Sequence, residues 1–277
     1  MPQGSVLITG ASTGIGEACA LHLDRLGFTV FAGVRKAVDG EALRSKASNR
    51  LTPLRMDVTD GASIEAAVRT LQGRPLAGLV NNAGVNVSAP VELLPLERLR
   101  YQLEVNVVGQ VAVTQAFLPS LRAGRGRIVN MGSIGGRSTA PVQGAYGASK
   151  FALEAITDSL RMELKPWDIH VSIVEPGAIR TPIWDKGISE ADRLFQSVPP
   201  DQADLYRKLI EALRNMAGRS AKGAISPDSV AFAVAHALTA ARPKTRYLVG
   251  RDAKIQALLV HLPDRWRDAL ILKFIGM

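Results

Sequence analysis

A tyrosine and a lysine, Tyr146 and Lys150, stand four residues apart in the stretch QGAYGASKFALEA. Positions i and i+4 share one face of a helix, so both side chains can contact the same ligand. A phenol is a poor base at neutral pH, but a neighbouring ammonium group favours its phenolate form. The pair could therefore take a proton from an alcohol or give one to a carbonyl. The spacing alone is only suggestive, because Tyr146 could equally fill a crevice.

A glycine-rich turn follows the apolar run SVLIT near the N-terminus. Gly10, Gly14 and Gly16 separate that run from a helical pattern, which is the layout of an anion site at a helix N-terminus. Their spacing, G-x-x-x-G-x-G, differs from the G-x-G-x-x-G dinucleotide fingerprint. We interpret the turn as a phosphate loop, although a strand-to-helix turn needs glycines for its own geometry as well.

The second apolar run ends in Val34 and Arg35, and no acidic residue follows before Asp39. A carboxylate here would bond the ribose 2′-hydroxyl of NAD, whereas an arginine can bind a 2′-phosphate. The sequence therefore favours NADP over NAD. An arginine that is merely exposed is the alternative interpretation.

The elements that would position these side chains follow from apolar periodicity. Strands are expected at 5–9, 29–33, 51–56, 77–81, 127–131, 170–174 and 246–250, and helices at 14–26, 62–71, 96–118, 146–164 and 227–240. This alternation predicts a doubly wound α/β fold with a seven-stranded parallel sheet and helices on both faces. No linker divides it, so we predict a single domain over 1–277. The carboxyl ends of the strands, where such sheets bind ligands, would bring together Gly132-Ser133, residues 81–84 and residues 176–177.

Two segments depart from this rhythm. Residues 181–225 mix helical and turn signals and are interpreted as an inserted substrate flap, since long insertions in compact domains are usually functional. The pattern of residues 252–277 predicts two short helices that are separated at Pro263. We expect the apolar face of this tail to pack on the domain or on a second subunit; its basic flanks leave peripheral membrane contact as a second possibility.

Bulk properties exclude several classes of function. The net charge is +9, but the 34 basic residues are dispersed without a basic patch, so we expect no nucleic-acid partner. The single cysteine, Cys19, is expected to be a buried helix residue, and the four histidines lack a metal-binding spacing, so no metal is predicted. Without a leader-like start or 18 uninterrupted apolar residues, a cytoplasmic location is expected.

Six motifs occur together and in order: TGASTGIG at 9–16, NNAG at 81–84, Asn106, Ser133, Tyr146-x-x-x-Lys150 and PG at 176–177. Together they resemble the short-chain dehydrogenase/reductase superfamily, over about residues 5 to 250. The segments GFTVFAGVRKAVDGEAL and RYLVGRDAK, followed by LPDRW, further resemble the branch that holds retinol, hydroxysteroid and 3-hydroxybutyrate dehydrogenases. The resemblance implies a Rossmann-type fold and an oxidoreductase that uses NAD(P).

In the family mechanism, Tyr146 exchanges a proton with the substrate while hydride moves to or from the nicotinamide. The resemblance implies that Lys150 lowers the pKa of Tyr146 and holds the nicotinamide ribose, and that Ser133 bonds the substrate oxygen. Asn106 would anchor a water that joins Lys150 to solvent. Each residue has a plainer alternative: Ser133 could only shape a turn, and Asn106 could only satisfy helix backbone.

The remaining cofactor contacts are implied position by position. They are Gly10, Ser12, Thr13, Gly14, Ile15 and Gly16 in the phosphate loop, Arg35, Asp57 and Val58 near the adenosine, Asn81, Ala83 and Gly84 beside its ribose, and Pro176, Gly177, Ile179 and Thr181 under the nicotinamide. Tyr146 and Lys150 contact the cofactor as well. Family analogy also implies a homodimer or homotetramer formed through the two long helices.

The substrate should lie between the loop 134–144, residues 178–184 and the flap. The expected lining residues are Ile134, Val142, Pro182, Ile183, Trp184, Leu194 and Phe195. These are mostly apolar and favour a lipophilic alcohol or ketone, such as a steroid, a retinoid or a fatty-acyl derivative. Arg137 and Arg180 could instead meet a carboxylate. A 3-oxoacyl-thioester reductase and a non-catalytic nucleotide sensor on the same fold remain the alternatives.

Overall fold

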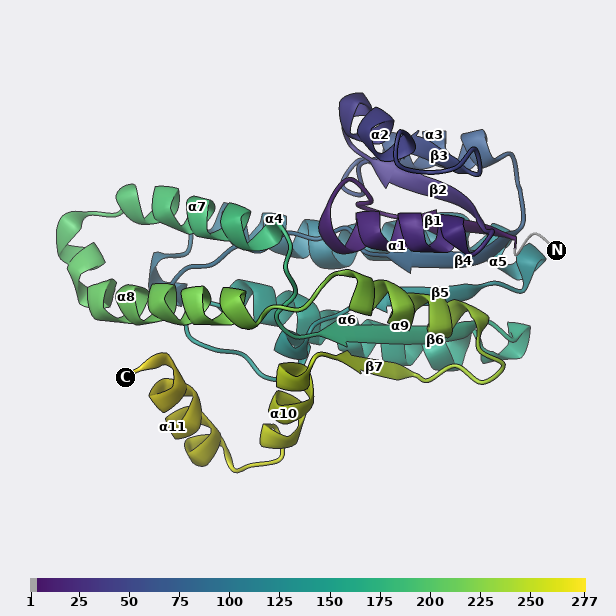
Figure 1. The fold of residues 1–277 in the computed structure, drawn as a ribbon. Coiled ribbons are helices and arrows are strands. Elements are labelled where there is room, and N and C mark those ends of the chain that lie inside the picture. Colours follow the sequence, from purple (N-terminus) through teal and green to yellow (C-terminus); the bar gives the residue numbers. More distant parts are fainter. Residues whose placement is uncertain (1–3) are drawn as a thin grey trace.

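Seven parallel strands form one sheet through the centre of the molecule, in the order β3-β2-β1-β4-β5-β6-β7 (Figure 1). The computed structural model describes the backbone of residues 4–277 and the side chains of these residues except 185–186, 217 and 219–222. The strands are β1 (Ser5–Ile8), β2 (Thr29–Val34), β3 (Leu51–Arg55), β4 (Leu76–Asn81), β5 (Arg127–Met131), β6 (His170–Pro176) and β7 (Arg246–Val249). All seven predicted strands are thereby confirmed. The strand order reverses at β1 and β4, which is where doubly wound sheets bind their ligands.

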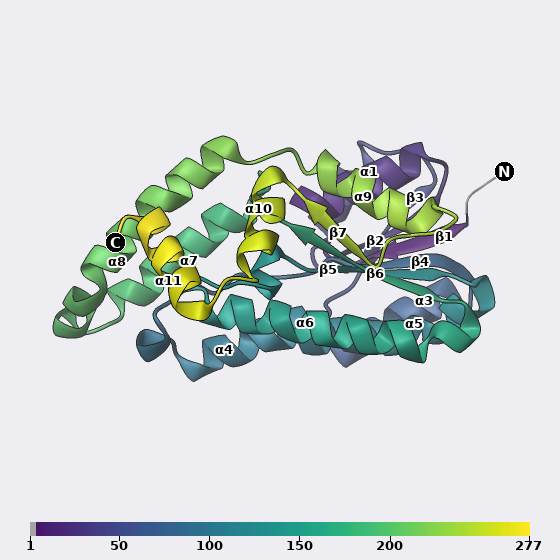
Figure 2. The ribbon, with the colours of Figure 1, turned by 90° about the horizontal axis from the view of Figure 1, so that it is seen from below.

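Helices cover both faces of this sheet (Figure 2). Helices α1 (Gly14–Arg25) and α9 (Asp228–Thr239) lie on one face, and α3 (Gly61–Leu71), α4 (Leu96–Leu103), α5 (Gly109–Gly124) and α6 (Gly144–Glu163) lie on the other. Single 3₁₀ turns occur at η1 (Val91–Leu93), η3 (Ile134–Gly136) and η4 (Lys165–Trp167). The five predicted helices are all present, with ends that differ by a few residues.

Helix α2 (Ala37–Arg44) was not predicted. Its sequence, AVDGEALR, carries a glycine that weakens the helical pattern. The structure shows a packing reason for this residue: a Cβ at Gly40 would lie 2.8 Å from Cβ of Pro53 in β3. Gly40 therefore lets α2 approach the edge strand closely.

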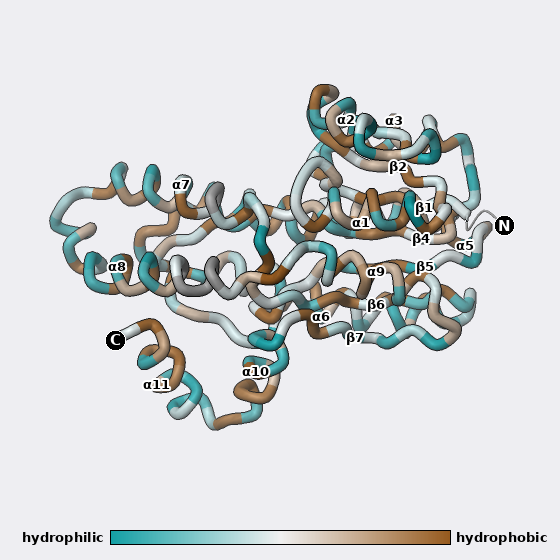
Figure 3. Tube along the Cα trace, viewed as in Figure 1, coloured by the Kyte–Doolittle hydropathy of each residue, from teal (hydrophilic) through white to brown (hydrophobic). Residues whose placement is uncertain are grey.

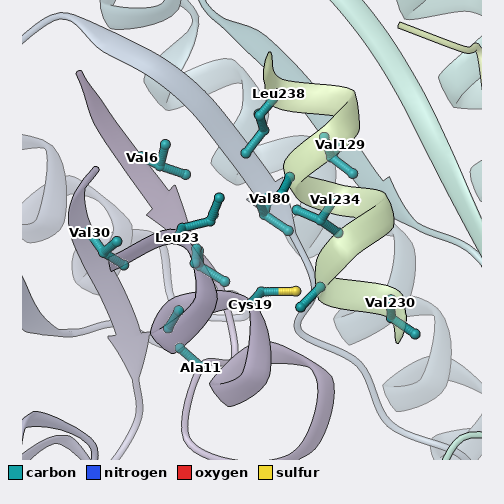
Figure 4. Close-up of a cluster of buried hydrophobic side chains, with 14 of the residues drawn as sticks. Val6, Ala11, Cys19, Leu23, Val30, Val80, Val129, Val230, Val234 and Leu238 are labelled. Atoms are coloured by element: carbon teal, nitrogen blue, oxygen red, sulfur yellow. The ribbon is translucent and has the colours of Figure 1, made fainter. Parts of the chain in front are cut away.

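The hydrophobic core has one part on each side of the sheet. Between the sheet and the α1/α9 pair, Val6, Val80 and Val129 pack against Leu23 and Leu238 (Figure 4). Cys19 lies in the same cluster and is fully buried, as expected. Burying each of these large side chains contributes roughly 1.5–3 kcal/mol to folding. The opposite cluster is centred on Leu79, Phe117, Leu121 and Ile128 and fixes α5 under β4 and β5.

The helix predicted at 96–118 is interrupted by a π-helical turn, η2 (Glu104–Val108), between α4 and α5. Single π turns insert one extra residue into a helix and are frequent at functional sites. Here the turn buries Val105 and Asn106 against the sheet edge. The sequence pattern does not distinguish this turn from ordinary α-helix.

The predicted flap consists of two long helices, α7 (Ile183–Gln196) and α8 (Pro200–Gly223), which form a hairpin beyond the carboxyl edge of the sheet (Figure 1). The flap is almost entirely helical, whereas its sequence indicated a mixture of helix and turn. An ion pair between Arg98 and Glu190 joins it to α4, and the Tyr206 hydroxyl donates to a Glu92 carboxylate oxygen at 2.5 Å. The flap is thus held over the same sheet edge.

The tail forms α10 (Arg251–Leu259) and α11 (Asp264–Ile275), with the predicted break at Pro263. Ala253 and Ala257 of α10 pack on Ile134, so the tail contacts the loop that follows β5. Helix α11 lies beside α8, and its trace contains both hydrophobic and hydrophilic segments (Figure 3). In the described part of the chain, no helix combines the length and apolarity that a membrane crossing requires.

Candidate active site

Ser133 and Tyr146 meet at the carboxyl end of β5. Ser133 is the N-cap of η3, and its Oγ accepts a hydrogen bond from the Gly135 amide at 3.1 Å. A Cβ at Gly135 would lie 3.3 Å from the Tyr146 ring and 3.4 Å from that Oγ. The ring and the serine hydroxyl therefore border one small space, and a hydrogen bond joins their side chains.

Lys150 lies on the same face of α6, one turn beyond Tyr146. Its side chain is 4% exposed, and its Nζ donates to the carbonyl oxygen of Met131 at 2.7 Å. The Nζ stands 5.7 Å from the centre of the Tyr146 ring. The structure thus brings Ser133, Tyr146 and Lys150 together, as the sequence predicts.

Burial dominates the electrostatics of this pair. It raises the pKa of Tyr146 above its ordinary value, and the hydrogen bond with Ser133 offsets only part of this effect. Burial also lowers the pKa of Lys150 to about 8, against the attraction of Glu154. The net shift of the Tyr146 pKa is therefore upward, because desolvation outweighs the other causes, and the lowering contribution expected from Lys150 stays a prediction.

Both the oxygen and the nitrogen of the Asn106 side-chain amide form hydrogen bonds near the site. Its Oδ1 accepts from the Val85 amide at 2.8 Å, and its Nδ2 donates to the Val85 carbonyl at 3.0 Å and to the Ser149 hydroxyl at 3.1 Å. Ser149 in turn donates to the carbonyl of Tyr146 at 2.7 Å. Asn106 therefore connects the π turn to the first turn of α6, and its predicted role in holding a water stays a prediction.

The glycine loop is closed by residues that the sequence analysis did not single out. The Thr9 hydroxyl accepts from the amides of Asn82 and Ala83, both at 2.9 Å, and Nδ2 of Asn82 donates to the carbonyls of Thr9 and Gly10. A Cβ at Gly16 would lie 2.2 Å from the Gly10 oxygen. The motifs at 9–16 and 81–84 contain both residues, so their joint occurrence was the signal that could have identified them.

The start of α1 fits the phosphates of a dinucleotide. Thr13 is its N-cap but makes no side-chain capping bond, so the first amides, from Gly14 onward, keep their donors for an anion. Ser12, Thr13 and Ile15 are at least partly accessible in this turn. Gly14 has φ +62°, a conformation that favours glycine.

The residues predicted near the adenosine lie at the ends of β2 and β3. Arg35 directly follows β2, is exposed, and pairs with no carboxylate in the described part of the chain. Asp57 follows β3 and accepts from the Thr59 amide and hydroxyl at 3.0 and 2.8 Å. Val58 is buried beneath the first turn of α5, with its carbonyl 2.7 Å from a Cβ built at Gly109.

The side chain of Asn81 points away from the sheet edge, so only its backbone could lie beside a ribose as predicted. Its side chain is buried, and its Nδ2 donates to Thr114 at 2.8 Å and to Asn130 at 3.0 Å. The amide therefore ties β4 to α5 and β5 beneath the sheet edge. Ala83 and Gly84 continue to the edge itself, where the Gln110 amide donates to the Ala83 carbonyl at 3.1 Å.

The segment predicted to support the nicotinamide is fixed by the C-terminal tail. The amide of Gly177 donates to the Val249 carbonyl at 2.9 Å, and that of Ala178 donates to the Asp252 carboxylate at 2.6 Å. Asp252 was not predicted. A Cβ at Gly14 would lie 3.1 Å from Thr181, so this segment contacts the phosphate loop.

Pro176 and Ile179 of this segment are buried, and Ile179 belongs to the α1/α9 core. Its side chain therefore faces away from a cofactor, and only its backbone is available for one.

Two arginines considered for a substrate carboxylate are already occupied. Nε of Arg137 lies 2.6 Å from a Glu175 oxygen, and Glu175 is fully buried. Nη2 of Arg180 donates to the Ala224 carbonyl at 3.2 Å. Because of its ion pair with Glu175, Arg137 is not available to bind a carboxylate of the substrate. The predicted lining of the substrate site is therefore mainly apolar.

The expected lining residues fall into two groups. Ile134 and Val142 belong to the loop that carries Ser133, and Ile183 and Trp184 begin α7 directly after the 176–182 segment, in which Pro182 is the N-cap. The indole nitrogen of Trp184 donates to the Ile179 carbonyl at 2.9 Å.

Leu194 and Phe195 lie at the far end of α7. Leu194 lines a cavity of about 290 Å³ against residues 92–95, and Phe195 lines one of about 390 Å³ between α7 and α8. Neither cavity includes Tyr146 among its lining residues, so the contact of Leu194 and Phe195 with a substrate stays a prediction.

Val142 has a backbone conformation unusual for its type. Its φ is +62°, which strains a β-branched residue. Its carbonyl accepts from the Ala89 amide at 3.0 Å and so links the substrate loop to the segment after β4. Strain of this kind clusters at ligand sites.

The chain matches known proteins along most of its length. A family model described as short chain dehydrogenase matches residues 5–192. A 3-amino-tetrahydro-pyrrolizinone reductase from Xenorhabdus hominickii is 39% identical, covering 97% of this chain and 96% of that protein. Retinol dehydrogenase 5 from Mus musculus is 38% identical, covering 96% and 87%. Estradiol 17-beta-dehydrogenase 2 from Mus musculus is 37% identical, covering 98% and 74%.

Solved structures show the same architecture. A short-chain dehydrogenase from Streptomyces avermitilis superposes with a TM-score of 0.79 at 28% identity, covering 99% of this chain and 97% of that one. A short chain dehydrogenase from Burkholderia cenocepacia, solved in complex with NADP, superposes with a TM-score of 0.74 at 27% identity, covering 100% of both chains.

Proposed function

The chain belongs to the short-chain dehydrogenase family of NAD(P)-dependent oxidoreductases, and on this premise we propose that it interconverts an apolar secondary alcohol and its ketone. The observation that carries this proposal is the convergence of Ser133, Tyr146 and Lys150 at one sheet edge, next to an uncapped helix N-terminus. A nucleotide sensor without turnover would not need this set intact.

The mechanism assigns one task to each side chain. When bound, the nicotinamide supplies or accepts the hydride. The Ser133 hydroxyl bonds the substrate oxygen and holds it beside the Tyr146 hydroxyl, which gives a proton to a carbonyl or takes one from an alcohol. Lys150, which is buried, would hold the ribose of the bound cofactor, and its ammonium group would supply positive charge beside the phenol. Asn106, through Ser149, fixes the turn of α6 on which Tyr146 stands.

An apolar substrate is favoured by two independent observations. The Arg137 guanidinium already forms an ion pair with Glu175, so it is not available to a substrate carboxylate. The loop that carries Ser133 also includes the apolar residues Ile134 and Val142. Relatives that cover nearly the whole chain are named for retinol and estradiol, both apolar alcohols. A 3-oxoacyl-thioester reductase remains the second candidate, to be tested with the same panel of substrates.

For the cofactor we propose a preference for NADP over NAD. Arg35 supports this proposal because it stands free at the end of β2, where a 2′-phosphate would lie, and no carboxylate neutralises it in the described part of the chain. The Asp57 carboxylate follows the next strand, where it already accepts two bonds from Thr59.

We also propose a homodimer or homotetramer built through α5 and α6. Apolar side chains are exposed on α6 and where the π turn η2 meets α5: Phe151 is 46% exposed and Val108 is 50% exposed. Exposed apolar area of this kind often marks an interface.

Peripheral membrane contact through α11 is a further proposal. Trp266 and Leu270 are exposed on one stripe of this helix, and Arg265 and Lys273 flank it. Binding to vesicles with anionic lipid that is lost in Trp266→Ser would support it, and equal binding of both proteins would exclude it. We propose that the protein otherwise resides in the cytoplasm, which cell fractionation would test.

Replacing the tyrosine tests the function itself. We expect Tyr146→Phe to lose at least about 100-fold in kcat on any apolar alcohol or ketone that the enzyme turns over, because acid–base catalysis contributes about 10²–10⁴-fold. NADPH binding, followed by the fluorescence of the nicotinamide, should change little. Full turnover by this variant would refute the proposed mechanism.

A further inference from the structure

One buried carboxylate next to the active site has no part in the mechanism above. Glu154 stands one turn beyond Lys150 on α6, so Tyr146, Lys150 and Glu154 follow one another at four-residue intervals along one helix face. Its side chain is only 8% exposed. Removing a charged carboxylate from water costs free energy, so such groups are buried only where ion pairs or hydrogen bonds compensate for the lost hydration.

Glu154 belongs to a ring of charged side chains from four elements. Nη2 of Arg246, in β7, lies 2.8 Å from a Glu154 oxygen and 3.0 Å from an Asp158 oxygen, and Nε of Arg246 lies 3.4 Å from Glu175 in β6. Glu175 pairs in turn with Arg137, which follows η3. The ring therefore connects α6 to the loop of Ser133 and to the strand that leads into Pro176-Gly177.

The positive charges in this ring are unevenly placed. Three carboxylates, Glu154, Asp158 and Glu175, face two guanidinium groups, Arg137 and Arg246. Arg161 compensates Asp158 from the outer end, at 2.5 Å. At the inner end, Oε1 of Glu154 is buried and has no hydrogen-bond partner among the described residues. Lys150 lies one turn before Glu154 on the same helix, and Glu154 acts on Lys150 electrostatically.

The backbone packs tightly at this point. A Cβ at Gly136 would lie 2.9 Å from the Lys150 carbonyl oxygen and 3.3 Å from Cγ of Glu154. The η3 turn that carries Ser133 at its N-cap therefore rests directly on the Lys150–Glu154 turn of α6. A change of charge here acts beside all three proposed catalytic groups.

We propose that Glu154 is a positioning residue of the reaction: its carboxylate, held by Arg246 one turn beyond Lys150, keeps the Lys150 ammonium group charged in its buried site. The proposal concerns Lys150 itself, and only its kinetic consequence rests on the proposed function. Glu154 does not contact the reacting atoms and acts through Lys150.

The two groups should titrate together. Burial and Glu175 raise the pKa of Glu154 to about 7, while Arg246 and Arg137 lower it. As the pH rises through this value, Glu154 becomes charged, and its charge raises the pKa of Lys150 against the effect of burial. Lys150 therefore keeps its proton to higher pH than it would beside a neutral residue. Asp158 and Glu175 add negative charge from α6 and β6, and Arg137, Arg161 and Arg246 oppose it.

The test measures the protonation of Lys150 directly in the enzyme without cofactor. Protein labelled with ¹³C at lysine Cε is titrated by NMR, with the Lys150 signal assigned through Lys150→Arg. We expect Glu154→Gln, which keeps the bond to Arg246, to lower the midpoint of Lys150 by about one pH unit, a tenfold change in proton affinity. In the wild-type protein, the Lys150 signal should show a second inflection as Glu154 titrates.

Two variants separate this effect from a general loss of charge. Asp158→Asn removes the same charge from the same ring, one turn farther from Lys150, and should shift the midpoint much less. Glu154→Asp restores the charge and should restore most of the midpoint. In carbonyl reduction, the alkaline limb of the kcat profile of Glu154→Gln should move to lower pH by the same amount as the Lys150 midpoint.

Several outcomes would overturn the proposal. An unchanged Lys150 midpoint in Glu154→Gln would do so, as would an equal shift in Asp158→Asn. If Glu154→Gln did not fold, a single inflection of Lys150 in the wild-type protein would do the same. Failure of Tyr146→Phe to lose activity would refute the proposed function and leave the NMR result standing, so the two failures are distinguishable.

Discussion

At the scale of single residues, the candidate site is set by desolvation more than by the ammonium–phenol pair. Burial raises the pKa of Tyr146 and lowers that of Lys150, so desolvation shifts each equilibrium towards the neutral form. The sequence indicates the attraction between the two side chains, but a desolvation cost depends on which atoms surround them. Those atoms come from β5, η3 and the π turn, which are distant in sequence.

Arg35 provides a residue-scale prediction about the cofactor. We expect Arg35→Ala to weaken NADPH binding about 10-fold or more and to leave NADH binding nearly unchanged, because a hydrogen-bonded charge contributes about 1.5–3 kcal/mol. Binding is measured by nicotinamide fluorescence for both cofactors.

Lys36→Ala is the matched control for Arg35, since it removes the same charge from the neighbouring exposed position. A similar loss of NADPH binding in both variants would reduce the effect to general electrostatics. Equal loss of NADH and NADPH binding in Arg35→Ala would show that Arg35 does not read the 2′-phosphate.

At the scale of elements, the glycine loop and the strand beside it act as one unit. Gly16 packs so closely that a methyl group would lie 2.2 Å from the Gly10 oxygen and 2.5 Å from Nδ2 of Asn82. Asn82 is the residue that joins this loop to the end of β4. The start of α1 therefore depends on a contact with the 81–84 segment.

Gly16→Ala is expected to disrupt this unit. Relieving the overlap requires backbone movement, so we expect a loss of roughly 1–3 kcal/mol in the free energy of unfolding, typical of overpacking, together with loss of NADPH binding. Urea unfolding and fluorescence titration measure the two effects.

Gly61→Ala, at the start of α3, is the control for Gly16→Ala. Nothing lies within 4 Å of its added methyl group, so it should be neutral or slightly stabilising. Unchanged stability and binding in Gly16→Ala would contradict the close packing of the loop.

At the scale of the whole molecule, the flap and the C-terminal tail both contact segments at the edge of the sheet where the candidate site lies. The flap is fastened to α4 by Arg98 and Glu190, and the tail fixes the Pro176–Thr181 segment through Asp252. Exposed apolar side chains also occur on α6, at Phe151 and Met162, and at Val108, where the π turn meets α5. The proposed interface with a second copy of the chain would cover these residues.

Phe151→Asp tests that interface. We expect this substitution to convert the homo-oligomer to a monomer of 29.6 kDa, because it places a charge in the apolar layer. Light scattering after size-exclusion chromatography measures the mass. Val38→Asp is the control, since Val38 is also an exposed apolar residue but lies on α2, outside the proposed interface. A wild-type monomer, or an unchanged mass in Phe151→Asp, would reject the α5/α6 interface.

The sequence by itself determined the seven strands, the five principal helices and the break at Pro263, because apolar periodicity and proline act locally. It also determined which residue types meet at the sheet edge, since parallel strands deliver their carboxyl ends to one side. Tyr146, Lys150 and Ser133 could be placed in this way.

Only the tertiary structure decided what these residues contact. Helix α2, the π turn around Asn106 and the inward direction of Asn81 depend on packing against distant segments. The same holds for the ring in which Arg137 is paired and Glu154 is held beside Lys150. Desolvation and ion pairing arise between elements far apart in the chain, so no local pattern specifies them. For this reason, the opposed pKa shifts of Tyr146 and Lys150 became visible only in the folded protein.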